Sequence, residues 1–287
     1  MRRKSRNRFL VISAFIVLFA LVFGYYQNNK LEVSTYHLTN ERSGPVRIAH
    51  LSDLHGKQFG TNNRRLLETV LDQEPDLVVV TGDSIHFTGM NLEKVVGFLS
   101  ELNETVPVVV ISGNQEWRSR EGDEFIGSLR AHGVIYLENE IYTLVADGST
   151  VHILGLDERM GGSTHAPGDP SDQHDPYETQ DPAALLAELA QMPGLRIVLS
   201  HYPQYYALEG NPPYNQFDFD LMFSGHAHGG QWNLPGIGGV YAHGQGVMPQ
   251  YYRGLYDGRL LVSAGLGNSG FPLRLFNHPQ LVIAQIN

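Results

Sequence analysis

Histidine, aspartate and asparagine side chains recur in this sequence directly after short apolar runs. The last of these positions lies in Phe223-Ser-Gly-His-Ala-His-Gly-Gly-Gln231, where His226 and His228 stand two residues apart in a glycine-rich turn. Glycine lets a backbone bend sharply and approach a ligand closely, and imidazole is the commonest protein metal ligand. Because loop histidines are more often solvated than ligating, the pair acquires meaning only from the positions that precede it.

Earlier apolar runs end in the same kinds of group. Asp53 and His55 follow one run, and Asp83, Asn114 and His201 each follow another. A set of imidazole, carboxylate and amide oxygen without thiolate suits borderline divalent ions such as Mn, Fe, Co or Zn. Seven ligands are too many for one tetrahedral site, but they match two adjacent ions that share one carboxylate. Each residue also has an ordinary structural explanation. Because potential ligands follow five successive apolar runs, however, a shared metal site is the better explanation of the set.

Alternating strands and helices would bring these side chains together. Continuous apolar runs such as 76–80 indicate buried strands, and open α/β sheets bind ligands beyond the carboxyl ends of their strands. We therefore predict one α/β domain over residues 46–287, with two sheets packed face to face. The expected strands cover 46–51, 76–80, 106–111, 134–137, 151–156, 195–199, a short run that includes Phe223, 260–263 and 281–286, and the expected helices lie at 62–74, near 92–99, at 125–131 and at 183–191.

One long segment has a different composition. Residues 157–182 are dominated by Asp, Gly, Pro and His and contain almost no aliphatic side chains. Loops of this length are either functional or disordered, so the segment would form a rim over the site or remain without fixed structure. Its His165 and His174 are interpreted as solvated rather than ligating.

The first 31 residues form a separate segment. Five basic residues precede an uncharged stretch of 18 residues, Phe9–Tyr26, which as a helix would span about 27 Å against the roughly 30 Å hydrocarbon core of a bilayer. No convincing small-residue cleavage site follows. We predict a single-pass signal anchor over 1–31 and a linker over 32–45 with one possible strand at Leu31–Leu38. A cleaved signal peptide is the alternative. For the signal anchor, the positive-inside rule would place the N-terminus in the cytoplasm and the domain outside it, at the cell membrane.

The rest of the chain is acidic. Six of the 20 Lys+Arg residues fall in 1–31, which contains no acid, so the remainder has 14 basic and 30 acidic residues and a formal charge of −16. Proteins that bind nucleic acid usually carry a basic patch, so we expect no nucleic-acid partner. The sequence has no cysteine, which excludes disulfides and thiolate metal sites but leaves the compartment open.

The order of the motifs resembles the signature of the calcineurin-like metallophosphoesterase superfamily. The blocks that carry this resemblance are Asp53-Leu-His55, Gly82-Asp83, Gly113-Asn-Gln-Glu116, Ser200-His201 and Gly225-His-Ala-His228. The membrane-anchored bacterial branch of YkuE/YaeI-like proteins is resembled by Gly229-Gly-Gln231, Leu234-Pro-Gly-Ile-Gly238 and Gly265-Leu-Gly-Asn-Ser-Gly-Phe-Pro272. The resemblance covers residues 46–287 and implies a β-sandwich flanked by helices.

The resemblance also implies a role for each motif residue. The first metal ion would be held by Asp53, His55, Asp83 and His228, and the second by Asp83, Asn114, His201 and His226, with Asp83 bridging. The residues implied in catalysis are Asp83, Asn114, Gln115 and His226. The reaction would be hydrolysis of a phosphoester, phosphodiester or pyrophosphate bond by a hydroxide that bridges two divalent ions, with manganese favoured.

Gln115 departs from the family pattern, which usually has histidine after the asparagine. A glutamine can donate a hydrogen bond but cannot transfer a proton, and general acids typically contribute 10²–10⁴-fold. The enzyme would therefore favour good leaving groups, recruit another acid such as His86, or be slow. The expected substrate is a phosphate-containing small molecule or lipid, either lipid-linked or a nucleotide diphosphate. The alternative is a metal-binding scaffold or sensor that has lost catalysis.

Overall fold

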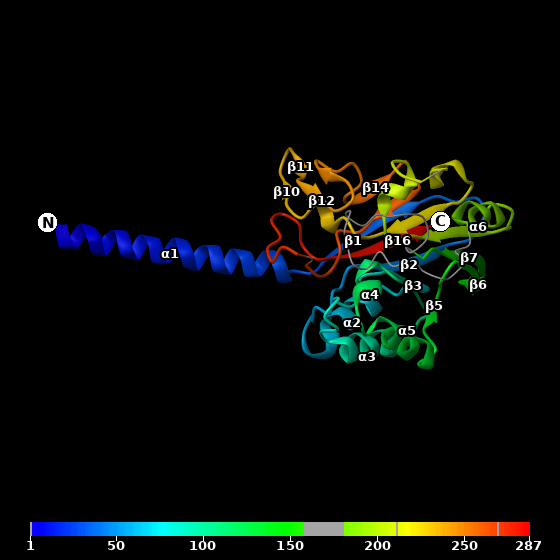
Figure 1. Ribbon diagram of the computed structural model, residues 1–287, viewed down its shortest axis with the longest axis horizontal. Helices are drawn as coiled ribbons and strands as arrows, with labels where there is room; N and C mark the ends of the chain where they lie inside the picture. The colour runs from blue at the N-terminus through cyan, green and yellow to red at the C-terminus, as the bar shows by residue number, and fades with distance from the viewer. Residues whose placement is uncertain (1, 158–180, 211, 269) are drawn as a thin grey trace.

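Two six-stranded sheets form the centre of the molecule in this computed structural model, which describes every residue except 1, 158–180, 211 and 269 (Figure 1). The sheets pack face to face through side chains such as Val79 and Val109 of the first sheet and Ile197 of the second, all 0% exposed. Burial of each such side chain stabilises the fold by roughly 1.5–3 kcal/mol. This architecture confirms the predicted α/β sandwich.

The first sheet has its ligand-bearing strands in parallel. Its order is β1 (Glu32–Leu38), β16 (Gln280–Ile286), β2 (Val46–Leu51), β3 (Leu77–Thr81), β4 (Val108–Ile111) and β5 (Ile135–Tyr136). The last residues of β3 and β4, Thr81 and Ile111, are direct partners across the ladder. The carboxyl ends of β2, β3 and β4 therefore meet at one edge of the sheet.

The second sheet is mostly parallel as well. Its order is β14 (Gly254–Tyr256), β15 (Leu260–Val262), β9 (Leu221–Ser224), β8 (Leu195–Leu199), β7 (Ser149–Gly155) and β6 (Glu140–Ala146). Leu199 pairs with Phe223, so β8 and β9 end side by side. The strand β6 was not predicted, because its partly exposed side chains give it neither a continuous apolar run nor a clean alternation.

Helices cover the outer faces of the two sheets (Figure 1). Those packed on the first sheet are α2 (Arg64–Leu71), α3 (Leu92–Asn103) and α5 (Gly122–Ala131), whereas α6 (Pro182–Leu189) packs on the second. The short α4 (Asn114–Arg118) begins directly after β4. The helix expected over 62–74 is shorter, because Asn62, Asn63 and Glu74 adopt left-handed backbone conformations. Short 3₁₀ turns cover Thr61–Asn63, Pro203–Tyr206, Tyr214–Gln216 and His228–Gly230.

Segments outside the two sheets differ in part from the predictions. The strand expected near Leu31–Leu38 is present as β1, but it pairs in parallel with β16 and so extends the first sheet into the predicted linker. Two small hairpins, unpredicted, are formed by β10 (Asn233–Leu234) with β11 (Gly238–Gly239) and by β12 (Tyr241–Ala242) with β13 (Gly246–Val247). His165 and His174 lie outside the described residues.

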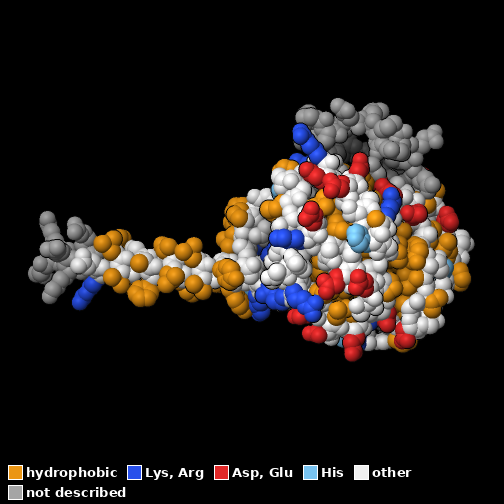
Figure 2. All heavy atoms as spheres, turned by 90° about the horizontal axis from the view of Figure 1, so that it is seen from below, with side chains coloured by type: hydrophobic (Ala, Val, Ile, Leu, Met, Phe, Trp, Pro, Cys, Tyr) orange, Lys and Arg blue, Asp and Glu red, His pale blue; other side chains and the backbone are white. Residues whose placement is uncertain are grey.

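The N-terminal helix α1 (Arg2–Asn29) projects away from the sheets (Figure 1). Its segment Asn7–Asn29 is long and apolar enough to cross a membrane, and none of its most apolar window is buried inside the protein. A buried core helix would show the opposite. Figure 2 shows these hydrophobic side chains exposed along its length.

Candidate metal centre

All seven predicted ligands follow the carboxyl ends of five strands, three in the first sheet and two in the second. Those from the first sheet follow β2, β3 and β4, and those from the second follow β8 and β9. Five are buried and the other two are partly exposed: Asp53, His55, Asp83, His201 and His228 in the first group, Asn114 and His226 in the second. The structure therefore brings six of the seven together in two clusters and places the seventh, Asn114, at the start of α4, shortly after the end of β4.

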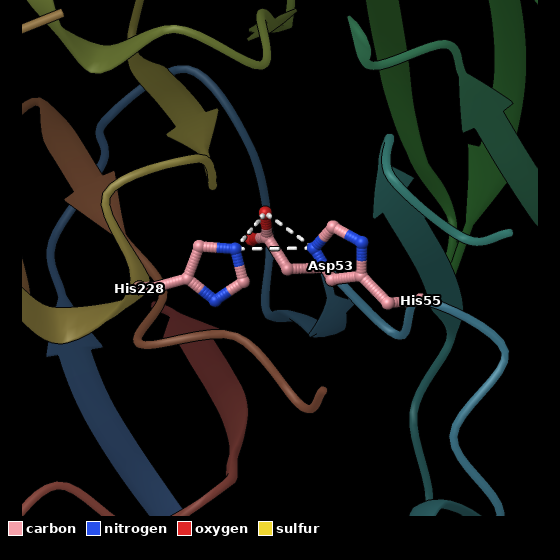
Figure 3. A group of neighbouring side chains, drawn as sticks. All are labelled: Asp53, His55 and His228. Carbon is pink, nitrogen blue, oxygen red and sulfur yellow. Dashed lines mark hydrogen bonds and ion pairs between the residues drawn. The ribbon is translucent and has the colours of Figure 1, made fainter. Parts of the chain in front are cut away.

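Asp53, His55 and His228 form the first cluster (Figure 3). The Nε2 atoms of the two histidines are 3.1 Å apart, and Oδ1 of Asp53 lies 3.4 Å from Nε2 of His228 and 3.9 Å from that of His55. The three side chains point toward one another in Figure 3, and their ligand atoms lie within 4.8 Å of each other. Such converging lone pairs suit a cation.

Asp83, His201 and His226 form the second cluster. Nε2 of His201 is 3.1 Å from Nδ1 of His226 and 3.4 Å from Oδ2 of Asp83. Nδ1 of His201 is engaged with the carbonyl oxygen of Thr81 at 2.7 Å, which orients the ring toward the cluster. A histidine ligand held through its second nitrogen in this manner is the usual arrangement in metal sites.

Asp83, a member of the second cluster, also lies near a histidine of the first. Its Oδ1 accepts a hydrogen bond from the backbone N–H of Gln115 at 2.8 Å. Its Oδ2 lies 3.4 Å from Nε2 of His201 and 3.6 Å from Nε2 of His55. One oxygen is thus fixed by the backbone, while the other faces the space between the clusters.

Two observations fit a bound cation at these clusters. The Oδ1 atom of Asn114 is buried and has no hydrogen-bond partner among the described residues. Within the same part of the chain, the ion pairs of Asp53 and Asp83 involve only histidines. Buried polar groups are normally satisfied and buried charges are normally paired or coordinate metals. A divalent ion at each cluster would meet both requirements.

The electrostatics of the site favour neutral imidazoles. Burial lowers the pKa of His55 to about 4 and holds the pKa values of His226 and His228 well below the ordinary range. Burial raises the pKa of Asp53 to about 6, against an opposing attraction to His201. Neutral imidazole is the form that binds a metal.

The turns that carry the ligands are strained. Five of the seven ligands have positive φ angles, between 48° and 61°: Asp53, His55, Asp83, His226 and His228. Non-glycine residues rarely adopt this conformation, and such strain persists only where the surrounding structure enforces it, often at functional sites. These five ligands are therefore directed by their turns rather than by the regular direction of their strands.

Glu116 is a buried residue to which we assigned no role from the sequence. Its carboxylate accepts hydrogen bonds from the backbone N–H groups of Gly113 at 2.7 Å and Asp83 at 2.9 Å, and also from those of Ser84 and Ile85. It therefore ties the turn after β3 to the turn after β4. Glutamate at the third position of a helix is a capping signal, and that pattern could have identified it.

Glycines allow the turns to approach the ligands. A Cβ atom on Gly225 would lie 1.8 Å from Oγ of Ser52 and 2.4 Å from Oδ2 of Asp53. Ser52 donates a hydrogen bond to the same Asp53 oxygen at 2.7 Å. The side chain of Asp53 is thus held in a space that exists only because residue 225 lacks a side chain.

Gln115 and two histidines border the clusters. Gln115 is 6% exposed, and its side-chain oxygen accepts a hydrogen bond from the backbone N–H of Phe87. His86, the predicted substitute acid, has its ring centroid 6.4 Å from that of His55. His243, which the sequence analysis did not single out, lies 6.2 Å from His226 by the same measure and is exposed.

Comparison with known proteins agrees with this geometry. A family model for the calcineurin-like phosphoesterase matches residues 46–230. The uncharacterized metallophosphoesterase YkoQ of Bacillus subtilis is 25% identical over 97% of this chain and 100% of its own length. Phosphodiesterase YaeI of Escherichia coli is 25% identical, covering 98% and 99% of the two chains, and metallophosphoesterase YkuE of B. subtilis is 28% identical, covering 83% and 77%.

Proposed function

We propose a reaction for this chain from the premise that it belongs to the calcineurin-like phosphoesterase family. Membership makes it a metal-dependent phosphohydrolase. The proposed reaction is hydrolysis of a phosphoester, phosphodiester or pyrophosphate bond with one divalent ion at each cluster. The observation that carries this proposal is Oδ2 of Asp83, which lies 3.6 Å from a nitrogen of one cluster and 3.4 Å from a nitrogen of the other.

The ligand roles follow from the two clusters. Asp53, His55 and His228 would hold the first ion, His201, His226 and Asn114 the second, and Asp83 would serve both. Two such ions activate water for in-line displacement and neutralise the phosphoryl oxygens. The donor set suits Mn, Fe, Co or Zn, and manganese is our first choice.

The protein itself would orient these ligands. The backbone N–H groups of Gln115 and His226 hold the carboxylates of Asp83 and Asp53. Gln115 cannot protonate a departing oxygen. His86 and His243 flank the first and second clusters respectively; we propose that neither replaces the missing acid, so that the enzyme favours substrates with good leaving groups.

The N-terminal helix would anchor the enzyme in the cell membrane, with the domain outside the cytoplasm. The support is the length and apolar character of Asn7–Asn29 and the basic residues that precede Phe9. The last turn of α1 is tied to the domain by several hydrogen bonds, among them the one from the backbone N–H of Phe276 to Gln27. This contact favours a retained anchor over a cleaved signal peptide. A lipid-linked substrate or a nucleotide diphosphate would suit an enzyme so placed.

Activity of the metal-loaded protein tests the proposed reaction. The full-length enzyme in detergent would be stripped with a chelator, reloaded with Mn²⁺, and assayed on an aryl phosphodiester, an aryl phosphomonoester and a nucleoside diphosphate. We expect turnover that needs the metal and is lost in His226→Ala. If both proteins bind Mn²⁺ and neither exceeds the background rate, the second candidate, a metal-binding scaffold motivated by Gln115, would replace the enzyme.

A further inference from the structure

The last turn of α1 is built into the domain. Asn28 accepts a hydrogen bond from the backbone N–H of Arg274 at 2.9 Å and donates one to the carbonyl oxygen of Pro272 at 2.8 Å. Gln27, only 4% exposed, accepts from the backbone N–H of Phe276 at 2.8 Å. Arg65 donates to the carbonyl oxygen of Asn29 at 2.9 Å, satisfying a group at the helix end that has no partner within the helix.

These contacts leave no flexible spacer between helix and domain. The apolar stretch Phe9–Tyr26 ends one residue before the buried Gln27. Because the junction is rigid, it fixes which face of the domain lies next to the apolar part of the helix. That face is the end of the domain from which α1 emerges (Figure 1).

A loop from this end runs beside the apolar part of the helix. The ring of Phe276 packs edge-on against Phe23, with centroids 6.1 Å apart. A Cβ atom added to Gly24 would lie 3.3 Å from the side chain of Leu273, and Tyr26 packs against His278. The loop therefore reaches the level of the last apolar turn of the helix.

The same end exposes apolar and basic side chains. Phe271, Phe276 and Ile237 are 47%, 49% and 57% exposed. Ile237 lies in the β10–β11 turn, and this hairpin is tied to the loop by a hydrogen bond from the backbone N–H of Asn233 to the carbonyl oxygen of Leu275. Figure 2 shows basic and hydrophobic side chains gathered where the helix joins the domain. In a domain with a formal charge of −16, this local composition is unusual.

We propose that this end, the α1-side face formed by Phe271, Phe276 and Ile237 with the exposed Arg65, lies in the headgroup region of a phospholipid bilayer. The proposal rests on the proposed anchor. Aromatic and aliphatic side chains beside a membrane span favour the interface, and nearby basic residues are attracted to anionic headgroups. The occupant is the bilayer because the loop packs against residues of the span itself.

This placement also brings the metal centre close to the membrane surface. The backbone of Arg274 contacts Asn28 of α1, and its guanidinium lies 3.3 Å from Nδ1 of the predicted ligand His228. The length of one arginine side chain therefore separates the end of the span from the first cluster. A phosphate on a lipid headgroup is the substrate class that such a position serves.

Single-cysteine labelling tests the proposal, since the chain contains no cysteine. Full-length Phe271→Cys and Ile237→Cys would carry an environment-sensitive fluorophore in phosphatidylcholine vesicles that contain phosphatidylglycerol. The matched control is Val145→Cys, which is 69% exposed on β6 at the far end of the domain (Figure 1). We expect lipids with a nitroxide near the headgroup to quench the labels at 271 and 237 several-fold more than the label at 145.

The outcomes separate this inference from the proposals beneath it. Equal quenching at the three positions, in protein that floats with the vesicles, would overturn the membrane contact and leave the anchor intact. If the labels at 271 and 237 are shielded from water in detergent but are not quenched by nitroxide lipids in vesicles, a second copy of the chain covers this face and the membrane contact is wrong. Failure to float would overturn the anchor and this inference with it. The quenching needs no turnover, so a failed activity assay would leave it unaffected.

Discussion

The side-chain oxygen of Gln115 accepts a hydrogen bond from the backbone N–H of Phe87 across 3.2 Å. The acceptor of this glutamine is therefore engaged with the turn that carries His86. Gln115 holds the neighbouring turn in place. Because a glutamine cannot transfer a proton, the partly exposed His86 and the exposed His243 are the side chains to test as proton donors.

Gln115→His should accelerate the hydrolysis of poor leaving groups most. An added general acid contributes up to 10²–10⁴-fold where the leaving oxygen needs a proton, and little for a nitrophenyl ester. The measurement is kcat/KM across phosphodiesters that differ in leaving-group pKa. Gln115→Ala is the control, because it also removes the contact with Phe87 but adds no acid. A wild-type rate that does not depend on leaving-group pKa would contradict this, and His86→Ala or His243→Ala would then reveal the donor.

Asp83→Asn should empty both metal positions, whereas His55→Ala should mainly empty the first. The reason is that Oδ2 of Asp83 faces both clusters, while His55 belongs to one. Elemental analysis of the purified variants gives the metal content of each. Asp123→Asn, an exposed carboxylate on α5, is the control and should retain the wild-type content. Loss of a single ion in both site variants would remove Asp83 from its bridging role.

Gly225→Ala should weaken binding at the first metal position. The new methyl group would meet Oγ of Ser52 at 1.8 Å and Oδ2 of Asp53 at 2.4 Å, so one of these side chains must move. Gly127→Ala is the matched control, since nothing lies within 4 Å of its added Cβ in α5 and alanine is the better helix former by about 1 kcal/mol. Titration of the metal-free proteins with Mn²⁺ compares them. Wild-type affinity in Gly225→Ala would mean that Asp53 is not confined as described.

Glu116→Gln should lower the free energy of unfolding by about 1–3 kcal/mol, the cost of leaving buried hydrogen-bonding groups unsatisfied. Each carboxylate oxygen accepts two backbone N–H groups, and an amide NH₂ would face one of those pairs. Urea unfolding with a chelator present, at an alkaline pH where a carboxyl with its pKa raised by burial to about 7 is ionised, measures the change. Glu101→Gln, on an exposed side chain, should stay within about 0.5 kcal/mol. Equal stability of the two variants would show that Glu116 does not fix the turns.

Val145→Cys should react with a membrane-impermeant maleimide on intact cells, whereas Asn7→Cys should react only after lysis. The basic residues before Phe9 favour a cytoplasmic N-terminus, and Val145 is exposed on the domain. The readout is the mass of the labelled protein. The reverse pattern would place the domain in the cytoplasm.

The sequence alone predicted the strands that carry the site because the information is local. A continuous apolar run such as Leu77–Val80 can only be a buried strand or helix segment, and the polar group that follows it marks the end. Parallel strands align their ends at one edge, so Asp53, Asp83 and Asn114 were expected together. The structure brings the two aspartates together with the four histidines, and the family match supports the chemistry.

Tertiary structure decided what no local pattern contains. The pairing of β1 with β16 joins segments about 250 residues apart, and it depends on which sheet edge the last strand leaves open. The four backbone contacts of Glu116 and the packing of Phe276 on Phe23 are set by turns whose conformations come from their neighbours rather than from their own residues. Residue types therefore determined the chemistry of the centre. Non-local packing determined how the ligands are divided between the two clusters and which face of the domain lies beside the N-terminal helix.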